Sequence, residues 1–306
     1  MNTEKPLIKL YRTRTFGDKI SDTFDFVREN WRVMLKYITY LLLPIALIQT
    51  FCMTNFMTGY MQAITMIGSS DISTMLPLLS SMALYMLVMY VGYVLVTALI
   101  YTMMQQYEQR PGLQGIMMSD LKPGVMNKSL RMVVLLLTGI VLMVVYGVLM
   151  VLLVAINRLM VFPAILLLLV ILPLFVLVCP IYLFENRGIV SAYAKSVRLG
   201  WKTWAGIVGV VLVLYIITMI LQTVVSMPGY IMLTVKNVLG GSGNATGFVS
   251  SFGFTAIQYL LGVISSFCGI CLMALITIGI AYQYGHACDK VDGVSVDKDI
   301  ENFETL

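Results

Sequence analysis

The chain has 306 residues, of which 59% are hydrophobic and only 11% are charged. Its mean hydropathy is +0.90, and its formal net charge at pH 7 is +5. Too few polar side chains remain to cover the surface of a water-soluble domain. The composition therefore excludes a soluble globular protein and favours one that uses lipid as its solvent.

The first predicted element is an amphipathic helix over residues 20–36. Apolar residues recur there at spacings of three and four, from Ile20 through Phe24 to Trp31, which places them on one face of a helix. Such a helix is typical of the membrane interface, where a Trp ring meets the lipid headgroups. We expect residues 1–30 to form a cytosolic N-terminal segment that contains this interfacial helix.

Six apolar runs follow, each longer than the roughly 18 residues that suffice to cross a bilayer as a helix. They cover residues 31–57, 76–104, 130–156, 159–184, 207–238 and 249–284. A strand of a membrane barrel would alternate in polarity, whereas these runs are apolar on every face. The predicted fold class is therefore an all-α integral membrane protein with six transmembrane helices, arranged as three tandem hairpins.

The fourth run contains three prolines, Pro163, Pro173 and Pro180, which we expect to kink it. Because a proline frees backbone carbonyl groups, such a kink could form a gate or a cavity. It could equally well serve only to shape the packing of the helices. The sequence leaves both interpretations open.

A second amphipathic helix is predicted over residues 190–206, immediately before the fifth run, and it repeats the first. In an ungapped alignment the shared positions are Ser21 with Ser191, Val27 with Val197, Arg28 with Arg198 and Trp31 with Trp201, while Arg32 faces Lys202. Each copy directly precedes an apolar run. The chain is therefore predicted to contain parallel repeats that enter the membrane from the same side.

The two copies carry the candidate site. We name the residues Arg28, Arg32, Arg198 and Lys202 the basic collar, and we take Trp31, Trp201 and Trp204 as interfacial anchors. One interpretation is that the helices only set the depth and angle of the spans that follow. The other is that the basic collar holds anionic lipid headgroups, with a contribution of about 1 kcal/mol per basic residue.

The charges predict an orientation. All Lys and Arg residues except Arg158 and Lys236 fall on the side of the membrane that holds the N-terminus. Because positive charge accumulates on the cytoplasmic side, both termini are expected in the cytosol, as an even number of spans requires. The expected location is the bacterial cytoplasmic (inner) membrane.

The predicted organisation is a single membrane domain, residues 1–306. After the N-terminal segment it comprises hairpin 1 (residues 31–109), a connector with hairpin 2 (residues 110–185), an interfacial helix with hairpin 3 (residues 186–288) and an acidic cytosolic tail (residues 289–306).

The sequence predicts no enzyme, no cofactor and no metal site. The interiors of the six runs carry no charged residue that would mark a proton relay or an ion path. His286 is the one histidine of the chain and is expected at the membrane interface. Cys268 and Cys271 form a C-G-I-C pair inside the sixth run, without the neighbouring positive charge that activates a thiol, so they are interpreted as packing residues.

Two segments carry a resemblance to a known family. Residues 17–31 read GDKISDTFDFVRENW, and residues 185–201 read ENRGIVSAYAKSVRLGW. The chain resembles the multi-span membrane domain of membrane-anchored glycerophosphodiester phosphodiesterases, and the related stand-alone six-span bacterial membrane proteins. In that family the phosphodiesterase lies in a separate soluble metal-binding barrel, for which this chain has no room, so the resemblance implies the membrane domain without the enzyme.

Three classes of function remain open. The first is a non-enzymatic membrane protein that interacts with lipids, anionic lipids among them, or supports envelope homeostasis. The second is a transporter or permease component for an amphipathic solute. The third is a membrane partner or immunity-type protein that binds another protein. Membrane lipids are the expected partners, a protein partner and the oligomeric state are left undetermined, and nucleic acid is not expected.

Overall fold

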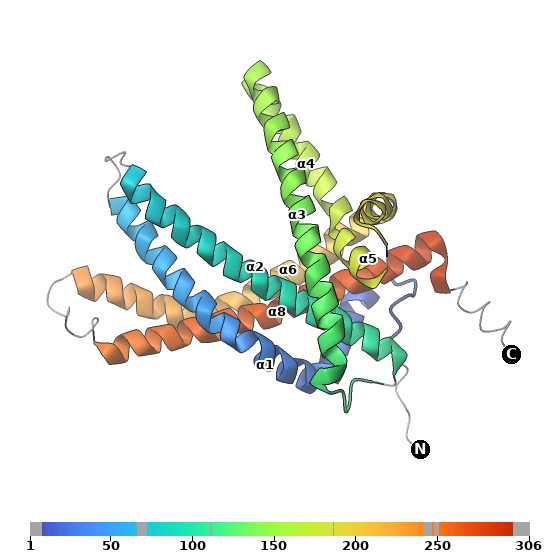
Figure 1. Ribbon diagram of the computed structural model, residues 1–306, viewed down its shortest axis with the longest axis horizontal. Coiled ribbons are helices and arrows are strands. Elements are labelled where there is room, and N and C mark those ends of the chain that lie inside the picture. Colours follow the sequence, from blue (N-terminus) through green and yellow to red (C-terminus); the bar gives the residue numbers. More distant parts are fainter. Residues whose placement is uncertain are drawn as a thin grey trace. The chain divides into compact units, whose positions relative to one another are not determined.

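The computed structural model describes residues 8–65, 72–110, 112–185, 187–241, 247 and 251–295 (Figure 1). Its main helices are α1 (Phe16–Thr65), α2 (Ile72–Gln109), α3 (Met118–Ile156), α4 (Val161–Val176), α5 (Val178–Phe184), α6 (Ile189–Gly241) and α8 (Phe252–Asp292). The short 3-10 helix η1 (Arg158–Met160) leads into α4. No residue in the described ranges lies in a β-strand.

Six helical segments are long and apolar enough to cross a membrane. The fourth of them combines η1, α4 and α5, and the other five are single helices. The predicted fold class, an all-α membrane protein with six spans, is confirmed. The helix α8 also continues through Asp292, so the first residues of the predicted acidic tail are helical, whereas residues 296–306 lie outside the described residues.

The two predicted interfacial helices differ in how they join the spans. The first belongs to α1, which runs without interruption from Phe16 to Thr65. The second is set off from its span within α6, because Thr203 leaves helical geometry with φ −124° and ψ 19°. Only the second copy is therefore a helical piece separated from its span, and the position of either copy at a membrane interface stays a prediction.

The chain divides into two compact units. Unit 1 comprises the described residues of Met1–Met34, Thr97–Tyr215 and Leu275–Leu306, and unit 2 comprises those of Leu35–Val96 and Ile216–Ala274. This division cuts across the first and third hairpins, because α1, α2, α6 and α8 each contribute to both units, whereas the second hairpin lies within unit 1. The single membrane domain stays a prediction.

Unit 2 is held together by close contacts between apolar helices and a few hydrogen bonds. The rings of Phe56 and Tyr85 stack with their centroids 6.0 Å apart and join α1 to α2. Thr50 Oγ1 donates to Ser266 Oγ at 3.1 Å, which links α1 to α8. Small polar residues of this kind are a usual means of joining helices in lipid, where no hydrophobic force drives apolar helices together.

A second polar contact of unit 2 joins α6 to α8. Gln222 Nε2 donates to Ser265 Oγ at 3.1 Å, and the hydroxyls of Ser226 and Ser265 are 2.7 Å apart. Gly269 leaves room for the Gln222 side chain, because an added Cβ would lie 3.3 Å from its Oε1 atom. Helices α6 and α8 therefore meet around the side chain of Gln222, which Gly269 accommodates.

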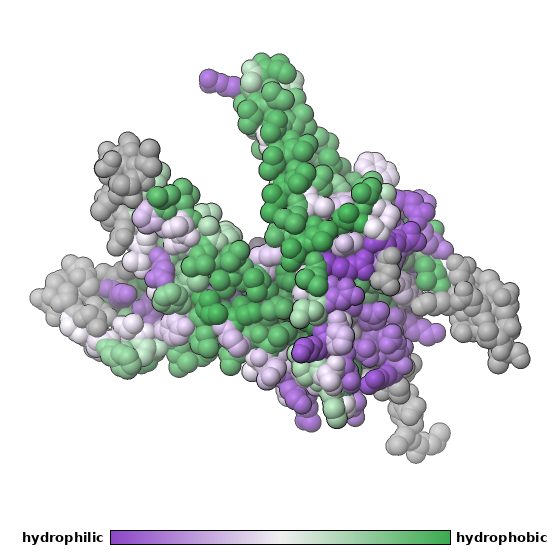
Figure 2. Space-filling model, viewed as in Figure 1, coloured by the Kyte–Doolittle hydropathy of each residue, from purple (hydrophilic) through white to green (hydrophobic). Residues whose placement is uncertain are grey.

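Unit 1 contains the second hairpin, which is formed by α3 and α4. Tyr146 OH on α3 donates to the carbonyl of Ala164 on α4 at 2.7 Å. None of the residues in the most apolar stretch of α3 is buried, so this helix exposes a large apolar surface. Hydrophobic colour covers this hairpin in Figure 2. Such a surface is stable in lipid and is far larger than the apolar patches that soluble monomers expose.

The fourth span is interrupted between α4 and α5 at Leu177, three residues before Pro180. The prolines of this run predicted a kink, and the break occurs beside Pro180, whereas Pro163 and Pro173 lie within α4. Ser196 of α6 donates from Oγ to the carbonyl of Leu174 at 2.6 Å, close to the break. Gly200 lets α6 approach there, because a Cβ on it would lie 3.0 Å from Leu174 Cα. The break is therefore filled by a packed helix, which favours the packing interpretation of the prolines.

Candidate functional site at the charged end of unit 1

The two repeat copies expose equivalent residues. Trp31 is 51% exposed and Trp201 is 68% exposed, and each lies beside exposed basic residues. The equivalent positions Phe26 and Ser196 are both fully buried. Both copies thus turn the same side of the repeat outward, and the apolar stripe predicted for the first copy lies on its exposed side.

The basic collar is not a set of four free cations. Arg28 pairs with Asp25 at 2.6 Å, and Arg198 pairs with Asp292 at 2.7 Å. The guanidinium of Arg32 lies over the ring of its neighbour Trp31, 5.4 Å from the centroid. Lys202 is exposed, and no ion pair joins it to another described residue. Arg32 and Lys202 are therefore the two members that are most available to an external anion.

Trp204 is placed differently from the other two anchors. The indole Nε1 of Trp204 donates to the carbonyl of Val170 at 3.1 Å, and the residue is 37% exposed. This ring therefore fastens α6 to α4. Trp31 and Trp201 remain the two anchors with widely exposed rings, and the interfacial role of all three stays a prediction.

An ionic network that the sequence analysis missed is built around Glu185, directly after α5. Its Oε1 atom accepts from Lys195 Nζ at 2.6 Å and from Tyr284 OH at 2.7 Å, and its Oε2 atom lies 2.7 Å from Arg187 Nε. Lys195 also reaches Asp292 at 3.5 Å, and the Lys195 side chain is only 10% exposed. The sequence did place Glu185, a charged residue, directly after an apolar run, and this position could have indicated the network.

The N-terminal segment is a second feature that the sequence analysis missed. Residues 8–15 lie across the ends of α2 and α8. Leu10 is buried, and its N–H donates to Glu108 Oε1 at 3.0 Å. Tyr11 OH contacts Tyr284 OH at 3.2 Å, and burial raises the pKa of Tyr11 to about 12. Leu10 and Tyr11 are apolar or aromatic residues in a charged stretch, which was the sequence signal for docking.

Arg14 and His286 fix the other end of this segment. The backbone N–H of Arg14 donates to His286 Nδ1 at 3.0 Å. The Arg14 side chain is buried and donates from Nε to Asp22 Oδ2 at 2.6 Å. Its guanidinium group also lies over the ring of Tyr282, 4.7 Å from the ring centroid. His286 was expected at the membrane interface. It is 9% exposed because the N-terminal segment packs against it, and its position at a membrane interface stays a prediction.

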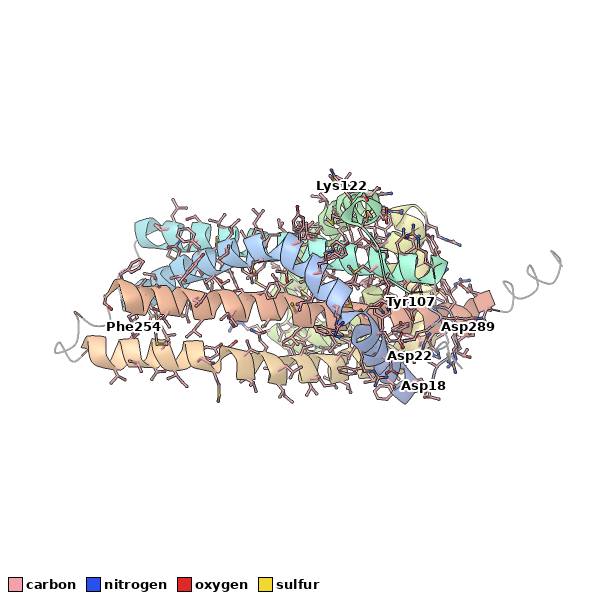
Figure 3. The ribbon with its side chains drawn as sticks, turned by 90° about the horizontal axis from the view of Figure 1, so that it is seen from below. Asp18, Asp22, Tyr107, Lys122, Phe254 and Asp289 are labelled. Atoms are coloured by element: carbon pink, nitrogen blue, oxygen red, sulfur yellow. The ribbon has the colours of Figure 1, made fainter. Side chains whose placement is uncertain are left out.

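Figure 3 places Asp22 on the first turns of α1 and Asp289 near the end of α8, at the same end of unit 1 as Tyr107 of α2. The polar groups of unit 1 gather here, as the hydrophilic colour in Figure 2 also shows. We name this region the charged end of unit 1. Among the residues that the structure describes, no three His, Cys, Asp or Glu side chains are grouped so that they could hold a metal ion.

The fold and this site define a polytopic α-helical membrane protein with a charged end built from the termini of α1, α2, α6 and α8. Searches of family models, of curated proteins and of solved structures found no match to the chain. The resemblance to the membrane domain of membrane-anchored phosphodiesterases therefore stays a proposal.

Proposed function

We propose that this protein is a non-enzymatic membrane protein that binds anionic lipid headgroups at the charged end of unit 1. The proposal includes the bacterial cytoplasmic membrane as its location and a cytosolic position for both termini. The observation that carries it is the repeated pair of an exposed Trp and an exposed basic residue, Trp31 with Arg32 and Trp201 with Lys202.

The chemistry of these pairs suits a headgroup layer. An indole ring is apolar over most of its surface and places its N–H among polar groups, so exposed Trp residues hold a helix at the depth of the headgroups. A Lys or Arg beside such a ring is then held close to lipid phosphates. The apolar surface of α3 and α4 supports the same environment, because only lipid or another apolar surface would cover it.

The first test reverses the charge of the two collar residues without an ion pair. The variant Arg32→Glu/Lys202→Glu should lose anionic lipid, because each basic residue contributes about 1 kcal/mol and two together contribute roughly 30-fold in binding. The measurement is native mass spectrometry of the protein from nanodiscs that contain phosphatidylcholine and phosphatidylglycerol, with the retained lipids counted.

The control reverses the same number of charges elsewhere. Lys122→Glu/Arg158→Glu changes two exposed basic residues that lie outside the basic collar. It should retain phosphatidylglycerol as the unmodified chain does. Equal retention by all three proteins, or an equal loss in both variants, would refute the role of the basic collar. A protein that copurifies in fixed ratio without any selective lipid would instead favour the alternative of a membrane partner protein.

A further inference from the structure

The second repeat copy has an exposed basic face on α6. Trp201 and Lys202 follow Arg198 by three and four residues, so the three side chains are neighbours on one face of the helix. All three residues are exposed. Arg198 is therefore placed to add a second cation to the pair of Trp201 and Lys202, on which the proposed function rests.

The guanidinium of Arg198 is held by a carboxylate from another helix. Its Nη2 atom donates to Asp292 Oδ1 at 2.7 Å, and Asp292 is the last residue of α8. The side chain of Arg198 is 56% exposed and that of Asp292 is 20% exposed. A lipid phosphate would accept from the same N–H groups, because carboxylate and phosphate oxygens suit a guanidinium equally in geometry. Asp292 therefore occupies the position that a headgroup would need.

The acid beside the equivalent arginine of the first copy has a different origin. Arg28 pairs at 2.6 Å with Asp25, which lies three residues earlier on the same helix. In the second copy the position of Asp25 is taken by Lys195. The acid for Arg198 therefore comes from α8. An acid on the same helical turn stays beside its arginine, whereas an acid on another helix can be separated from it.

Lys195 does not depend on Asp292 for its compensation. Its Nζ atom lies 2.6 Å from Glu185 Oε1 and 3.5 Å from Asp292 Oδ2. If Asp292 moves away, Lys195 keeps the shorter of its two ion pairs. Arg198, by contrast, has no second ion pair with any residue in the described part of unit 1. Displacement of Asp292 therefore frees one cation, the guanidinium of Arg198.

The end of α8 requires little free energy to open. Gly293 follows Asp292 with φ +69°, a left-handed conformation that ends a helix. Two hydrogen bonds close this turn, from the N–H groups of Gly293 and Ser295 to the carbonyl and the Oδ1 atom of Asp289, at 3.0 and 2.9 Å. Helix ends open more easily than helix interiors, and a partly exposed ion pair adds little resistance.

We propose that Asp292 forms an autoinhibitory contact that occupies Arg198 until an anionic lipid headgroup displaces it. This inference rests on the proposed function and assigns a regulation to the same site. With Asp292 in place, the second copy offers only Lys202 to lipid. After displacement, Arg198 and Lys202 hold one phosphate together beside Trp201. An anionic surface repels the Asp292 carboxylate, so a membrane rich in anionic lipid favours the displaced state.

The first experiment removes the carboxylate from the full-length protein in nanodiscs of phosphatidylcholine and phosphatidylglycerol. Native mass spectrometry measures the phosphatidylglycerol retained as its fraction in the nanodiscs is raised. Asp292→Asn should bind phosphatidylglycerol about fivefold more tightly, which corresponds to about 1 kcal/mol for one added basic residue. Asp292→Asn/Arg198→Gln should bind as the unmodified chain does, because the cation that the first change frees is absent.

A matched control separates this contact from the change in net charge. Asp120→Asn also neutralises an acid that pairs with an exposed arginine, Arg110, at 3.7 Å and outside the basic collar. It should bind phosphatidylglycerol as the unmodified chain does. An equal gain in Asp120→Asn and Asp292→Asn would overturn the proposal, because net charge rather than Arg198 would then account for it.

A second measurement needs no variant and keeps the test decisive if Asp292→Asn fails to fold. Hydrogen exchange of the unmodified chain is compared in nanodiscs with and without phosphatidylglycerol. The amides of Gly293 and Ser295 should exchange faster when phosphatidylglycerol is present, because displacement of Asp292 opens the turn that these amides close.

Failure of the autoinhibitory contact can be told apart from failure of the proposed function. If phosphatidylglycerol is lost in Arg32→Glu/Lys202→Glu but Asp292→Asn shows no gain, the basic collar binds lipid and the autoinhibitory contact alone is overturned. Unchanged exchange at the end of α8 in the presence of retained lipid has the same meaning. If Arg32→Glu/Lys202→Glu retains phosphatidylglycerol as the unmodified chain does, both proposals are overturned.

Discussion

Replacement of Gly285 by alanine is expected to detach the N-terminal segment from α8. A Cβ on Gly285 would overlap the carbonyl oxygen of Leu10 and lie 2.8 Å from its carbonyl carbon. Both atoms belong to the backbone, so the clash is relieved only if the segment moves. Overpacking of this kind costs about 1–3 kcal/mol, which exceeds the helix propensity of roughly 1 kcal/mol that a Gly→Ala change ordinarily gains.

The measurement is hydrogen exchange of residues 8–15 together with thermal unfolding in detergent micelles. The amides of Leu10 and Arg14 should lose protection, because their acceptors are Glu108 Oε1 and His286 Nδ1 across the displaced contact. Gly139→Ala is the matched control, since open space surrounds its Cβ position. If these amides exchanged as slowly in Gly285→Ala as in the unmodified chain, the predicted detachment of the N-terminal segment would be wrong.

Neutralisation of Glu185 is expected to destabilise unit 1 by roughly 2–4 kcal/mol, because it breaks a largely buried ion pair and leaves one charge behind. In the variant Glu185→Gln, the shape of the side chain is preserved. The Lys195 ammonium, only 10% exposed, then keeps Asp292 at 3.5 Å as its remaining anionic neighbour. Tyr284 OH also loses its charged acceptor. Denaturant or thermal unfolding in micelles measures the effect.

An exposed ion pair provides the control for this prediction. Asp25 and Arg28 are also 2.6 Å apart, but their side chains are 33% and 69% exposed. Asp25→Asn should change the unfolding free energy by less than about 1 kcal/mol, as is typical of surface pairs. A double-mutant cycle with Lys195→Met isolates the coupling of Glu185 with Lys195. A coupling near zero would show that the network does not stabilise the protein.

The six membrane-length helices could be predicted because the signal for them is local. A run of apolar residues in lipid must satisfy its own backbone hydrogen bonds, and a helix does so within the run itself. The interruption before Pro180 was predictable for the same reason, since proline lacks the N–H that would continue the helix. The repeat was also visible, because Trp31 and Trp201 occupy matching positions in two similar stretches.

The orientation of the repeat helices was only half predictable. Helical periodicity correctly placed Phe24 and Trp31 on one face, and the structure leaves that face exposed. The opposite side was interpreted as the polar side of an amphipathic helix, yet it contains Phe26, which is fully buried, and Asn30, which is 6% exposed. Periodicity divides a helix into faces, but which face another helix covers depends on residues that are distant in sequence.

The sequence by itself determined that this protein requires a lipid environment, that its fold is all-α, and where its exposed Trp and basic residues lie along the chain. Only the tertiary structure decided that Lys19 and His286 are buried and that the Lys195 side chain is only 10% exposed. Each of these polar residues has other polar residues near it in sequence, and nothing in the sequence distinguishes the ones that become covered. The difference arises from neighbours on α6, on α8 and in the N-terminal segment, because the burial of a charge depends on which groups surround it in space.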